Sequence, residues 1–352
     1  MRALRNKRIL ITGGVGTVGR ELVGQICKYH DPKEVRVIDN NESELFFLDQ
    51  HYGHDNRVFC YLGDIRDSYK LSNVMQGVNI VFHVAALKHV ILCEKSPWDA
   101  VQTNIKGVYN IINAAKENDV ELVLFTSSDK AVNPTNVMGT SKLMGERLIT
   151  AANATKLNGN GPVFSTTRFG NVLGSNGSVI PIFERQIKKG GPITITDLKM
   201  TRFIMTIEDA VSLVLESAKL AQGGEVFVSK MPVIRIEDLA YSMINLLAPK
   251  YGFKASEIGI EVIGAKPGEK LYEELMSEEE LRRSIELDNQ FVVLPAFRSA
   301  YHQISYNYAN IINKNIENPY NSNEEQPMSR QELEKYLVAK KLINLTLGCD
   351  RA

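Results

Sequence analysis

The chain has 352 residues, enough for a large core, and its 41 basic and 41 acidic side chains give a formal net charge of zero. This balance gives no electrostatic reason to expect a nucleic acid or an anionic membrane as a partner. The hydrophobic fraction of 44% is ordinary for a globular protein, and no apolar run approaches the ~18–20 residues of a membrane span.

Cysteine usage and the N-terminal sequence indicate the compartment. Residues 1–8 run into a short predicted strand and lack the apolar core of a signal peptide. The cysteines are scattered without paired spacing, at Cys27, Cys60, Cys93 and Cys349. We therefore expect reduced structural thiols in a cytoplasmic protein.

Short apolar runs alternate with longer helical patterns over the first half of the chain. Segments between the runs, such as residues 97–118, are long enough for crossover helices. The alternation predicts an α/β fold with a Rossmann-type, doubly wound parallel sheet that binds ligands at the carboxyl ends of its strands. The predicted strands are residues 8–12, 35–39, 58–61, 80–84 and 122–126.

A glycine-rich turn, residues 13–19, follows the first predicted strand and precedes a helix. Glycine lets the backbone approach a pyrophosphate, and the helix N-terminus offers amide donors and a positive dipole to it. Asp39 ends the second strand, where a carboxylate accepts hydrogen bonds from the adenosine ribose and repels a 2′-phosphate. The pattern predicts NAD, although the nearby Arg36 leaves NADP open. Asp64 ends the third strand and either reaches the adenine or caps its own turn.

The residues after the fifth strand combine a hydroxyl, an acid and an amine, in Ser128, Asp129 and Lys130. Their position predicts that they lie at the carboxyl edge of the sheet, near the nicotinamide. Taken alone, Asp129 and Lys130 would suit a solvated ion pair in a loop; their place behind a dinucleotide fold favours catalysis. Lys142 lies one helical turn after Met138, so that Lys142 would contact the nicotinamide ribose while residue 138 faces the substrate.

In the second half of the chain the regular alternation of apolar runs and helical patterns ends. Glycine and proline become frequent after residue 168, as in loops that shape a pocket. A capping-box-like start at residue 206 predicts a helix to about residue 220, and a second at Ser329 predicts a terminal helix to about residue 343. Between them, the asparagine-rich residues 307–323 predict a loop or a weakly ordered arm.

These patterns predict three parts of the chain. Residues 1–168 are expected to form the NAD-binding Rossmann domain, and residues 169–298 a smaller α/β substrate-binding region interleaved with it. Residues 299–352 form a C-terminal extension, which either contacts a second subunit or packs on the body; we favour packing. We also expect a homo-oligomer.

Several motifs together resemble the extended short-chain dehydrogenase/reductases, and within them the 4,6-dehydratases that act on UDP-N-acetylglucosamine. The resemblance covers about residues 5–290 and leaves the asparagine-rich tail outside. Residues 12–19, 83–89, 128–131 and 168–172 carry the first likeness, and residues 174–181, 200–203 and 266–272 carry the second.

The resemblance implies a chemical role for each residue of the reactive stretch. Oxidation at C4 of the sugar makes the C5 proton acidic, so that a base can remove it while an acid helps the C6 hydroxyl leave. Lys130 is then the base at C5, Asp129 the acid at C6, and Ser128 the hydrogen-bonding partner of the C4 hydroxyl. The implied cofactor ligands are Gly13, Gly16, Thr17, Val18, Gly19, Asp39, Asp64, Ile65, Ala85 and Lys142.

Met138 departs from the family pattern. Most relatives carry a tyrosine there that accepts the C4 proton, and a thioether cannot do this. The resemblance implies that Met138 marks the branch that retains configuration at C5, with Ser128, Asp129 or a water taking the proton instead. A related branch that inverts C5 can also carry methionine.

The resemblance also implies ligands for the sugar nucleotide. Arg202 suits phosphate oxygens because a guanidinium binds them bidentately. Asn171 and Ser178 would equally serve as turn caps, and Lys266 and Glu269 as solvated charges of a turn. His89 has no second ligand at metal spacing, so no metal site is expected, and no nucleophile elbow supports a serine hydrolase. The implied substrate ligands are Lys88, His89, Asn171, Ser178, Val179, Arg202, Lys266 and Glu269.

Three rival functions stay open at this point. A C5-inverting dehydratase and a C4 epimerase are the enzymatic alternatives, although an epimerase has no need of an adjacent acid and base. A nucleotide-sensing protein on an inactive dehydrogenase fold is the third, and Met138 is the reason to consider it.

Overall fold

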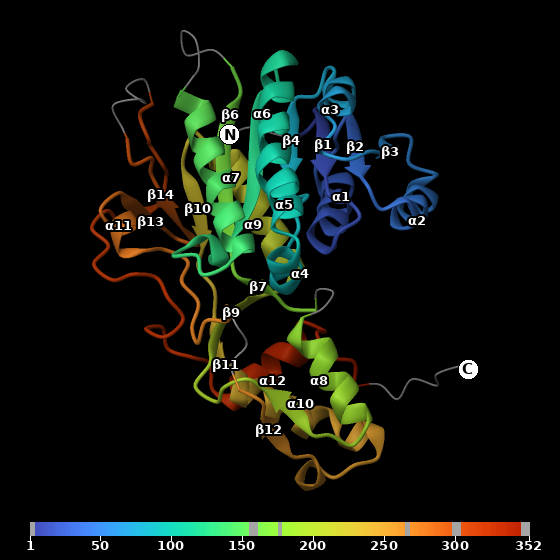
Figure 1. The fold of residues 1–352 in the computed structure, drawn as a ribbon, viewed down its shortest axis with the longest axis vertical. Coiled ribbons are helices and arrows are strands. Elements are labelled where there is room, and N and C mark those ends of the chain that lie inside the picture. Colours follow the sequence, from blue (N-terminus) through green and yellow to red (C-terminus); the bar gives the residue numbers. More distant parts are fainter. Residues whose placement is uncertain (1–3, 155–160, 175–177, 265–267, 298–303, 346–352) are drawn as a thin grey trace. The chain divides into compact units, whose positions relative to one another are not determined.

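The computed structural model describes residues 4–154, 161–174, 178–264, 268–297 and 304–345 (Figure 1). The chain divides into two compact units. The sheet unit comprises Met1–Phe169, Glu208–Lys230 and Leu275–Pro319, and the small unit comprises Gly170–Ile207, Met231–Glu274 and Tyr320–Ala352. The residues expected to form one C-terminal extension are therefore divided between the units at Pro319 and Tyr320.

The sheet unit is built on one ten-stranded sheet (Figure 1). Neighbouring strands run parallel from β3 through β10, with β1 paired to both β2 and β4. The last strands are antiparallel. In spatial order the strands are β15 (Ile311–Asn313), β13 (Ser284–Leu287), β14 (Gln290–Val293), β10 (Val226–Ser229), β6 (Val163–Phe169), β5 (Leu122–Ser128), β4 (Ile80–His83), β1 (Arg8–Thr12), β2 (Glu34–Asp39) and β3 (Val58–Leu62).

Strands β4 and β5 begin as continuous apolar runs, as expected where both faces of a sheet are covered. Every residue of β4 and β6 is buried, and so is all of β5 except its last residue, Ser128. Helices α3, α6 and α7 bury their apolar sides in one cluster with residues of β1, β4 and β5. The helices of this unit are α1 (Thr17–Tyr29), α2 (Glu42–Tyr52), α3 (Ser68–Met75), α4 (Val90–Lys95), α5 (Pro97–Ala100), α6 (Gly107–Glu117), α7 (Val137–Ala154), α9 (Ile207–Leu220) and α11 (Glu278–Leu281).

The small unit has its own core. Helices α8, α10 and α12 bury residues such as Phe183, Met243 and Leu333 in one cluster. The C-terminal helix thus belongs to this core, as the favoured packing of the extension requires. The unit contains β7 (Asn171–Val172), β8 (Ile193–Ile195), β9 (Thr201–Met205), β11 (Val233–Arg235), β12 (Ile260–Val262), α8 (Val179–Lys188), α10 (Ile236–Leu247) and α12 (Arg330–Ala339).

The Rossmann-type α/β class and the five predicted strands are confirmed, each within two residues at its ends. The predicted helices at 206–220 and 329–343 correspond to α9 and α12, and Ser329 and Glu332 form the expected capping box. The expectation of a loop over residues 307–323 is wrong in part, because β15 pairs with β13 and Tyr308 and Tyr320 are buried. Aromatic and β-branched residues between the asparagines explain the difference.

Candidate active site

The turn at residues 13–19 is shaped by close contacts that only glycine permits. Gly13 has a φ of +70°, and a Cβ there would lie 2.6 Å from the backbone nitrogen of Ala85. A Cβ on Gly19 would collide with the carbonyl oxygen of Gly13, and one on Gly14 with the side chain of Val37. The turn therefore holds strand, helix and β4 at backbone contact.

The turn leads into α1 without a capping side chain, because its N-cap is Gly16. The first residues of the helix, Thr17, Val18 and Gly19, thus carry the amides that a helix N-terminus presents to an anion. These features fit the expected dinucleotide.

Asp39 is the last residue of β2, as predicted, and Asp64 lies two residues beyond the end of the neighbouring strand β3. The Asp39 carboxylate accepts hydrogen bonds from the backbone nitrogens of Val15, at 3.2 Å, and Asn41, at 3.0 Å, and so ties β2 to the glycine turn. Burial opposes ionisation of Asp64, but hydrogen bonds from Arg66 outweigh it and lower the pKa of this carboxyl. The Asp64 carboxylate accepts hydrogen bonds from Arg66 and from the Asn40 side chain, which favours the turn-capping alternative for Asp64.

Two further expected cofactor ligands, Ile65 and Ala85, follow the ends of β3 and β4. Ile65 is buried against Gly107 of α6, and its carbonyl accepts a hydrogen bond from Asn110. Ala85 donates its N–H to Thr12 Oγ1 at 3.3 Å. Lys88 and His89 follow in an exposed stretch, and His89 is the N-cap residue of α4. Desolvation by neighbouring atoms lowers the pKa of Lys88.

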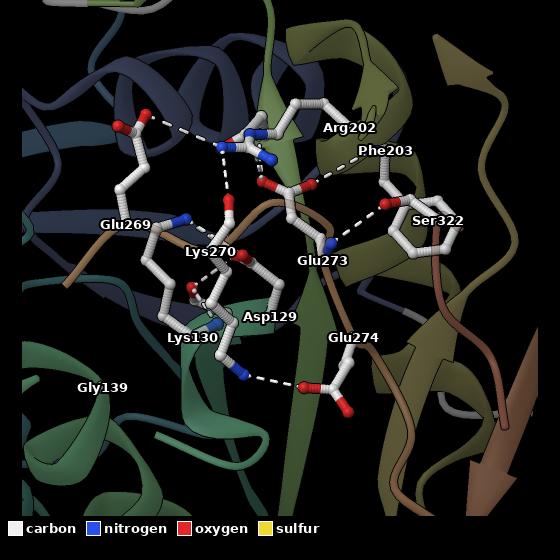
Figure 2. Close-up of polar contacts among 12 residues, drawn as sticks. Asp129, Lys130, Gly139, Arg202, Phe203, Glu269, Lys270, Glu273, Glu274 and Ser322 are labelled. Atoms are coloured by element: carbon white, nitrogen blue, oxygen red, sulfur yellow. Dashed lines mark hydrogen bonds and ion pairs between the residues drawn. The ribbon is translucent and has the colours of Figure 1, made fainter. Parts of the chain in front are cut away.

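Ser128, Asp129 and Lys130 are joined by hydrogen bonds at the carboxyl end of β5. Figure 2 shows the pair of Asp129 and Lys130. Ser128 Oγ donates to Asp129 Oδ1 at 2.8 Å, and Lys130 Nζ lies 3.1 and 3.0 Å from the two carboxylate oxygens. The Asp129 side chain is 6% exposed and that of Lys130 33% exposed. One buried carboxylate thus links a hydroxyl to an ammonium that reaches the surface.

Helix α7 packs directly against residues 128–130. A Cβ on Gly139 would collide with the carbonyl oxygen of Lys130, so the helix approaches to backbone contact. The Met138 side chain is 3% exposed and packs with Cys93 and Ala100 in a small apolar cluster. That it faces the substrate stays a prediction.

Lys142 is buried beneath the reactive stretch. Its Nζ donates to the carbonyl oxygen of Thr126 at 2.9 Å and lies 4.6 Å from the centroid of the Phe125 ring. Burial lowers the pKa of Lys142 to about 8, while the charge of Glu146 opposes the shift. The side chain is one turn from Met138, as the spacing predicts.

His83 opens the motif at residues 83–89 and is the last residue of β4, where its side chain has specific partners. Its Nδ1 lies 2.7 Å from Thr12 Oγ1, and its ring stacks on Phe125. Burial, reinforced by the charge of Lys142, lowers the pKa of His83 to about 3. The imidazole is therefore neutral and fixes the end of β4 beside the glycine turn.

A buried ionic cluster joins α7 to β6 and α11. Arg168, at 1% exposure, makes ion pairs with Glu146 at 2.6 Å and with Glu280 at 3.0 Å. It also donates to the carbonyl oxygen of Leu275. Arg168 lies in a motif of the sequence, but nothing there indicates partners more than 100 residues away.

In the small unit, Arg202 is surrounded by acceptors (Figure 2). Its guanidinium donates to the carbonyl oxygens of Thr201 and Lys270 and lies 3.4 Å from Glu273 and 3.7 Å from Glu269. The arginine side chain is 13% exposed. The expected ligands Arg202 and Glu269 are thus brought together, although as an ion pair with each other.

Glu273 is the residue that sequence reasoning missed here. Its carboxylate accepts hydrogen bonds from the Asn171 amide and, at 3.0 Å, from the backbone nitrogen of Phe203, besides pairing with Arg202. Asn171 is therefore held by Glu273. The only available signal was the position of Glu273 beside the motif that ends at residue 272.

The remaining expected ligands lie at the start of α8 or beyond what the structure describes. Ser178 is the N-cap residue of α8 but makes no side-chain cap bond, and Val179 is the first residue of the helix. Turn capping by the Ser178 hydroxyl is therefore not observed. Lys266 lies outside the described residues.

The described residues contain neither a cluster of metal ligands nor a helix that could span a membrane. No group of three or more histidine, cysteine, aspartate or glutamate side chains is placed to hold a metal ion in these segments. Within the same part of the chain, every helix falls short of the length and apolarity that crossing a membrane requires.

Comparison with known proteins identifies relatives along most of the chain. A family model described as "Polysaccharide biosynthesis protein" matches residues 9–295. The chain is 47% identical to a protein of Methanocaldococcus jannaschii named "Uncharacterized membrane protein MJ1061", over 95% of this chain and 96% of that protein. It is 37% identical to a Campylobacter jejuni protein named "UDP-N-acetylglucosamine 4,6-dehydratase (inverting)", over 83% and 84%. It is 39% identical to a Rickettsia massiliae protein named "UDP-glucose 4-epimerase", over 81% and 82%.

A solved relative extends the likeness to the fold. The X-ray structure of Pen from Bacillus thuringiensis is 40% identical and matches with a TM-score of 0.87, over 96% of this chain and 99% of that chain. The match includes most of the C-terminal region that lies beyond the family model.

Proposed function

The chain belongs to the polysaccharide biosynthesis protein family, and we propose that it catalyses the NAD-dependent 4,6-dehydration of UDP-N-acetylglucosamine. The product is UDP-2-acetamido-2,6-dideoxy-hexos-4-ulose. The observation that supports this most is the bonded set Ser128, Asp129 and Lys130 at the end of β5. Dehydration requires an acid and a base that lie next to each other, whereas epimerisation at C4 does not.

The sheet unit holds the cofactor in this proposal. Residues 13–19 and the N-terminus of α1 hold the pyrophosphate, and Asp39 selects NAD over NADP by accepting from the adenosine ribose. When bound, NAD would supply a hydride acceptor for C4 and a hydride donor for C6, so that the cofactor would be regenerated in each turnover. Lys142 orients the nicotinamide ribose.

The reactive stretch moves the protons. Ser128 passes the proton of the C4 hydroxyl to Asp129, whose Oδ1 already accepts from Ser128 Oγ. Asp129 then delivers that proton to the departing C6 hydroxyl, which leaves as water. Lys130 must first give one ammonium proton to solvent; as the neutral amine it removes the C5 proton once C4 is a ketone, and it returns a proton to C5 at the end. Asp129 lies within hydrogen-bond distance of both the Ser128 hydroxyl and the Lys130 Nζ, as proton transfer through this carboxyl requires.

The small unit binds the nucleotide in this proposal. Arg202 binds the diphosphate, and Asn171, Ser178 and Glu269 contribute to the uridine or the sugar. The support is that Arg202, Asn171 and Glu269 belong to one cluster of contacts.

We propose that the configuration at C5 is retained. Retention follows when one base both removes and returns the proton on the same face of the sugar, and Lys130 has both roles here. Met138 supports this branch by resemblance. The Campylobacter relative is named as an inverting enzyme, so inversion is the outcome that would overturn this part of the proposal.

Turnover of UDP-N-acetylglucosamine in deuterated water tests the proposal. Lys130 exchanges its proton with solvent, so the product should carry deuterium at C5 with unchanged configuration, as NMR of the product shows. Inverted C5 supports the inverting dehydratase. A C4 epimer without deuterium at C5 supports the epimerase, and tight binding without turnover supports the sensor.

Substitution of the base gives the largest expected loss of activity. Lys130→Ala should abolish dehydration, because no other group is assigned to the C5 proton. The measurement is product formation by the purified variant, with NAD binding as the check that it is folded. Lys33→Ala, at an exposed lysine of the same unit, is the control and should keep wild-type turnover. Near-normal turnover by Lys130→Ala would refute the role of Lys130.

A further inference from the structure

The nucleotide-binding candidates of the small unit share one buried acceptor. The Glu273 side chain is 6% exposed, and its Oε1 contacts both the Asn171 amide and Arg202 Nε, while Oε2 accepts from the backbone nitrogen of Phe203. A buried carboxylate needs such donors to remain charged. Because a single side chain fixes both Asn171 and Arg202, it also fixes the distance between them.

Glu273 is itself held by the C-terminal segment. Its backbone nitrogen donates to Ser322 Oγ at 2.9 Å, and the backbone nitrogen of Ser322 donates to the carbonyl oxygen of Glu273 at 2.8 Å (Figure 2). Ser322 is fully buried, and its hydroxyl also bonds to Thr201 Oγ1, one residue before Arg202. Ser322 therefore joins the two segments that carry Glu273 and Arg202.

A second residue of the same segment supports the strand of Arg202. The ring of Tyr320 lies 4.7 Å from that of Phe203, centroid to centroid. The Tyr320 hydroxyl accepts from the backbone nitrogen of Met231 at 2.7 Å and donates to its carbonyl oxygen at 3.1 Å. Tyr320 and Ser322 both lie beyond residue 295, where the family model ends.

From these contacts we propose that Glu273 is the positioning residue of the nucleotide site, and that Ser322 holds Glu273 in place. The ligand class is a nucleoside diphosphate, whose phosphates are bound by Arg202. The proposal rests on the proposed function for that ligand. It assigns the C-terminal segment a part in binding rather than in packing alone.

Arg202 has two carboxylate partners, and they differ in a way that matters for an anion. The Glu273 pair is the shorter one, and the Glu273 side chain is almost fully buried; the Glu269 pair spans 3.7 Å and its side chain is 28% exposed. A phosphate group can therefore displace Glu269, while Glu273 continues to hold the guanidinium. A bidentate phosphate contact depends on that fixed orientation.

The test compares UDP affinity, by calorimetry, between the wild type and matched variants of the full chain. Glu273→Gln should raise the Kd for UDP about tenfold, the usual range for loss of a charged hydrogen bond. In UDP-N-acetylglucosamine turnover the same change should appear mainly in KM. NAD affinity, which reports on the sheet unit, should stay at the wild-type value.

Glu274→Gln is the control because it removes the same charge one residue away, where Glu274 pairs with Lys270. If charge alone mattered, both variants would bind UDP more tightly. Unchanged UDP affinity in Glu273→Gln, or equal weakening in the two variants, overturns the proposal.

Ser322→Ala tests the contribution of the C-terminal segment without touching a charge. It should raise the Kd for UDP about threefold, since it removes a neutral hydrogen-bond partner. This variant also decides the matter if Glu273→Gln does not fold, and unchanged affinity would then overturn the proposal. A wild type that binds UDP but forms no dehydrated product would refute the proposed function and leave this proposal standing; a wild type that does not bind UDP would overturn this one.

Discussion

The two units assemble their candidate sites in different ways. In the sheet unit, the glycine turn and the reactive stretch are each made of consecutive residues, 13–19 and 128–130, placed by the ends of β1 and β5. In the small unit, Arg202 and its partners come from four segments around residues 171, 202, 273 and 322. A site of consecutive residues depends on backbone geometry, while a site of distant segments depends on the side chains that join them.

The first prediction tests how far the sheet unit depends on backbone geometry alone. Gly13→Ala should abolish NAD binding and destabilise the fold by about 4 kcal/mol, the sum of a positive φ and a backbone collision. The collision is with Ala85, at 2.6 Å from the added Cβ. The measurement is NAD affinity together with urea unfolding.

Gly252→Ala separates the two contributions. Gly252 also has a positive φ, +83°, but a Cβ there meets nothing within 4 Å. Its cost should be about 1 kcal/mol, from φ alone. Equal losses in the two variants would show that close approach does not matter at residue 13.

The second prediction concerns long-range charge pairing inside the sheet unit. Arg168→Met leaves Glu146 and Glu280 buried without their partner and should cost about 3–5 kcal/mol in urea unfolding. Arg330→Met removes an exposed pair with Asp238 and should cost at most about 1 kcal/mol. If Arg168→Met cost no more unfolding free energy than Arg330→Met, the ion pairs of Arg168 would not contribute to the stability of the sheet unit.

The third prediction is a pH dependence that belongs to the buried lysine of the sheet unit. Burial lowers the pKa of Lys142 from 10.5 to about 8. Between these values the unfolded chain holds a proton that the folded chain does not, so the stability rises with pH in this window, by about 3 kcal/mol for this residue. Below pH 8 the buried charge is a constant cost.

Lys142→Met should lack that rise, because no proton is released at this position. The measurement is the difference in unfolding free energy between wild type and variant at pH 7, 8, 9 and 10. Lys33→Met, at an exposed position, should leave the wild-type slope unchanged. A slope that survives in Lys142→Met would mean that this lysine keeps its ordinary pKa.

The smallest expected effect lies in the small unit. Tyr320→Phe removes the hydroxyl that bonds to Met231 and should cost about 1 kcal/mol of stability, measured by urea unfolding. Tyr69→Phe is the control, since Tyr69 is 78% exposed and should change nothing measurable. No loss in Tyr320→Phe would show that the ring of Tyr320, and not its hydroxyl, provides its contribution to stability.

Much of the sheet unit could be predicted from the sequence. Apolar runs bounded by turn residues located β1 to β5, and residues 13–19 could be placed because glycine has few substitutes where backbones touch. The contact of Ser128 and Lys130 with Asp129 also follows from adjacency in the chain. The roles proposed for these residues stay predictions until turnover is measured.

The surroundings of single side chains could not be predicted in the same way. Spacing placed Met138 one turn from Lys142, yet its burial against Cys93 depends on α4, which no local pattern brings there. Likewise, residues 307–323 have the composition of a loop, but pairing of β15 and burial of Tyr320 override that composition.

The fold class, the glycine turn, the reactive stretch and the helices predicted at 206–220 and 329–343 could be found in the sequence, because each depends on residues within a few positions of one another. The contacts of Glu273 with Asn171, Arg202 and Ser322, and the division of the C-terminal residues between two units, exist only in the folded chain. Those contacts join residues tens to more than a hundred positions apart in the chain. They form only once the small unit has folded and has closed the loops between these residues.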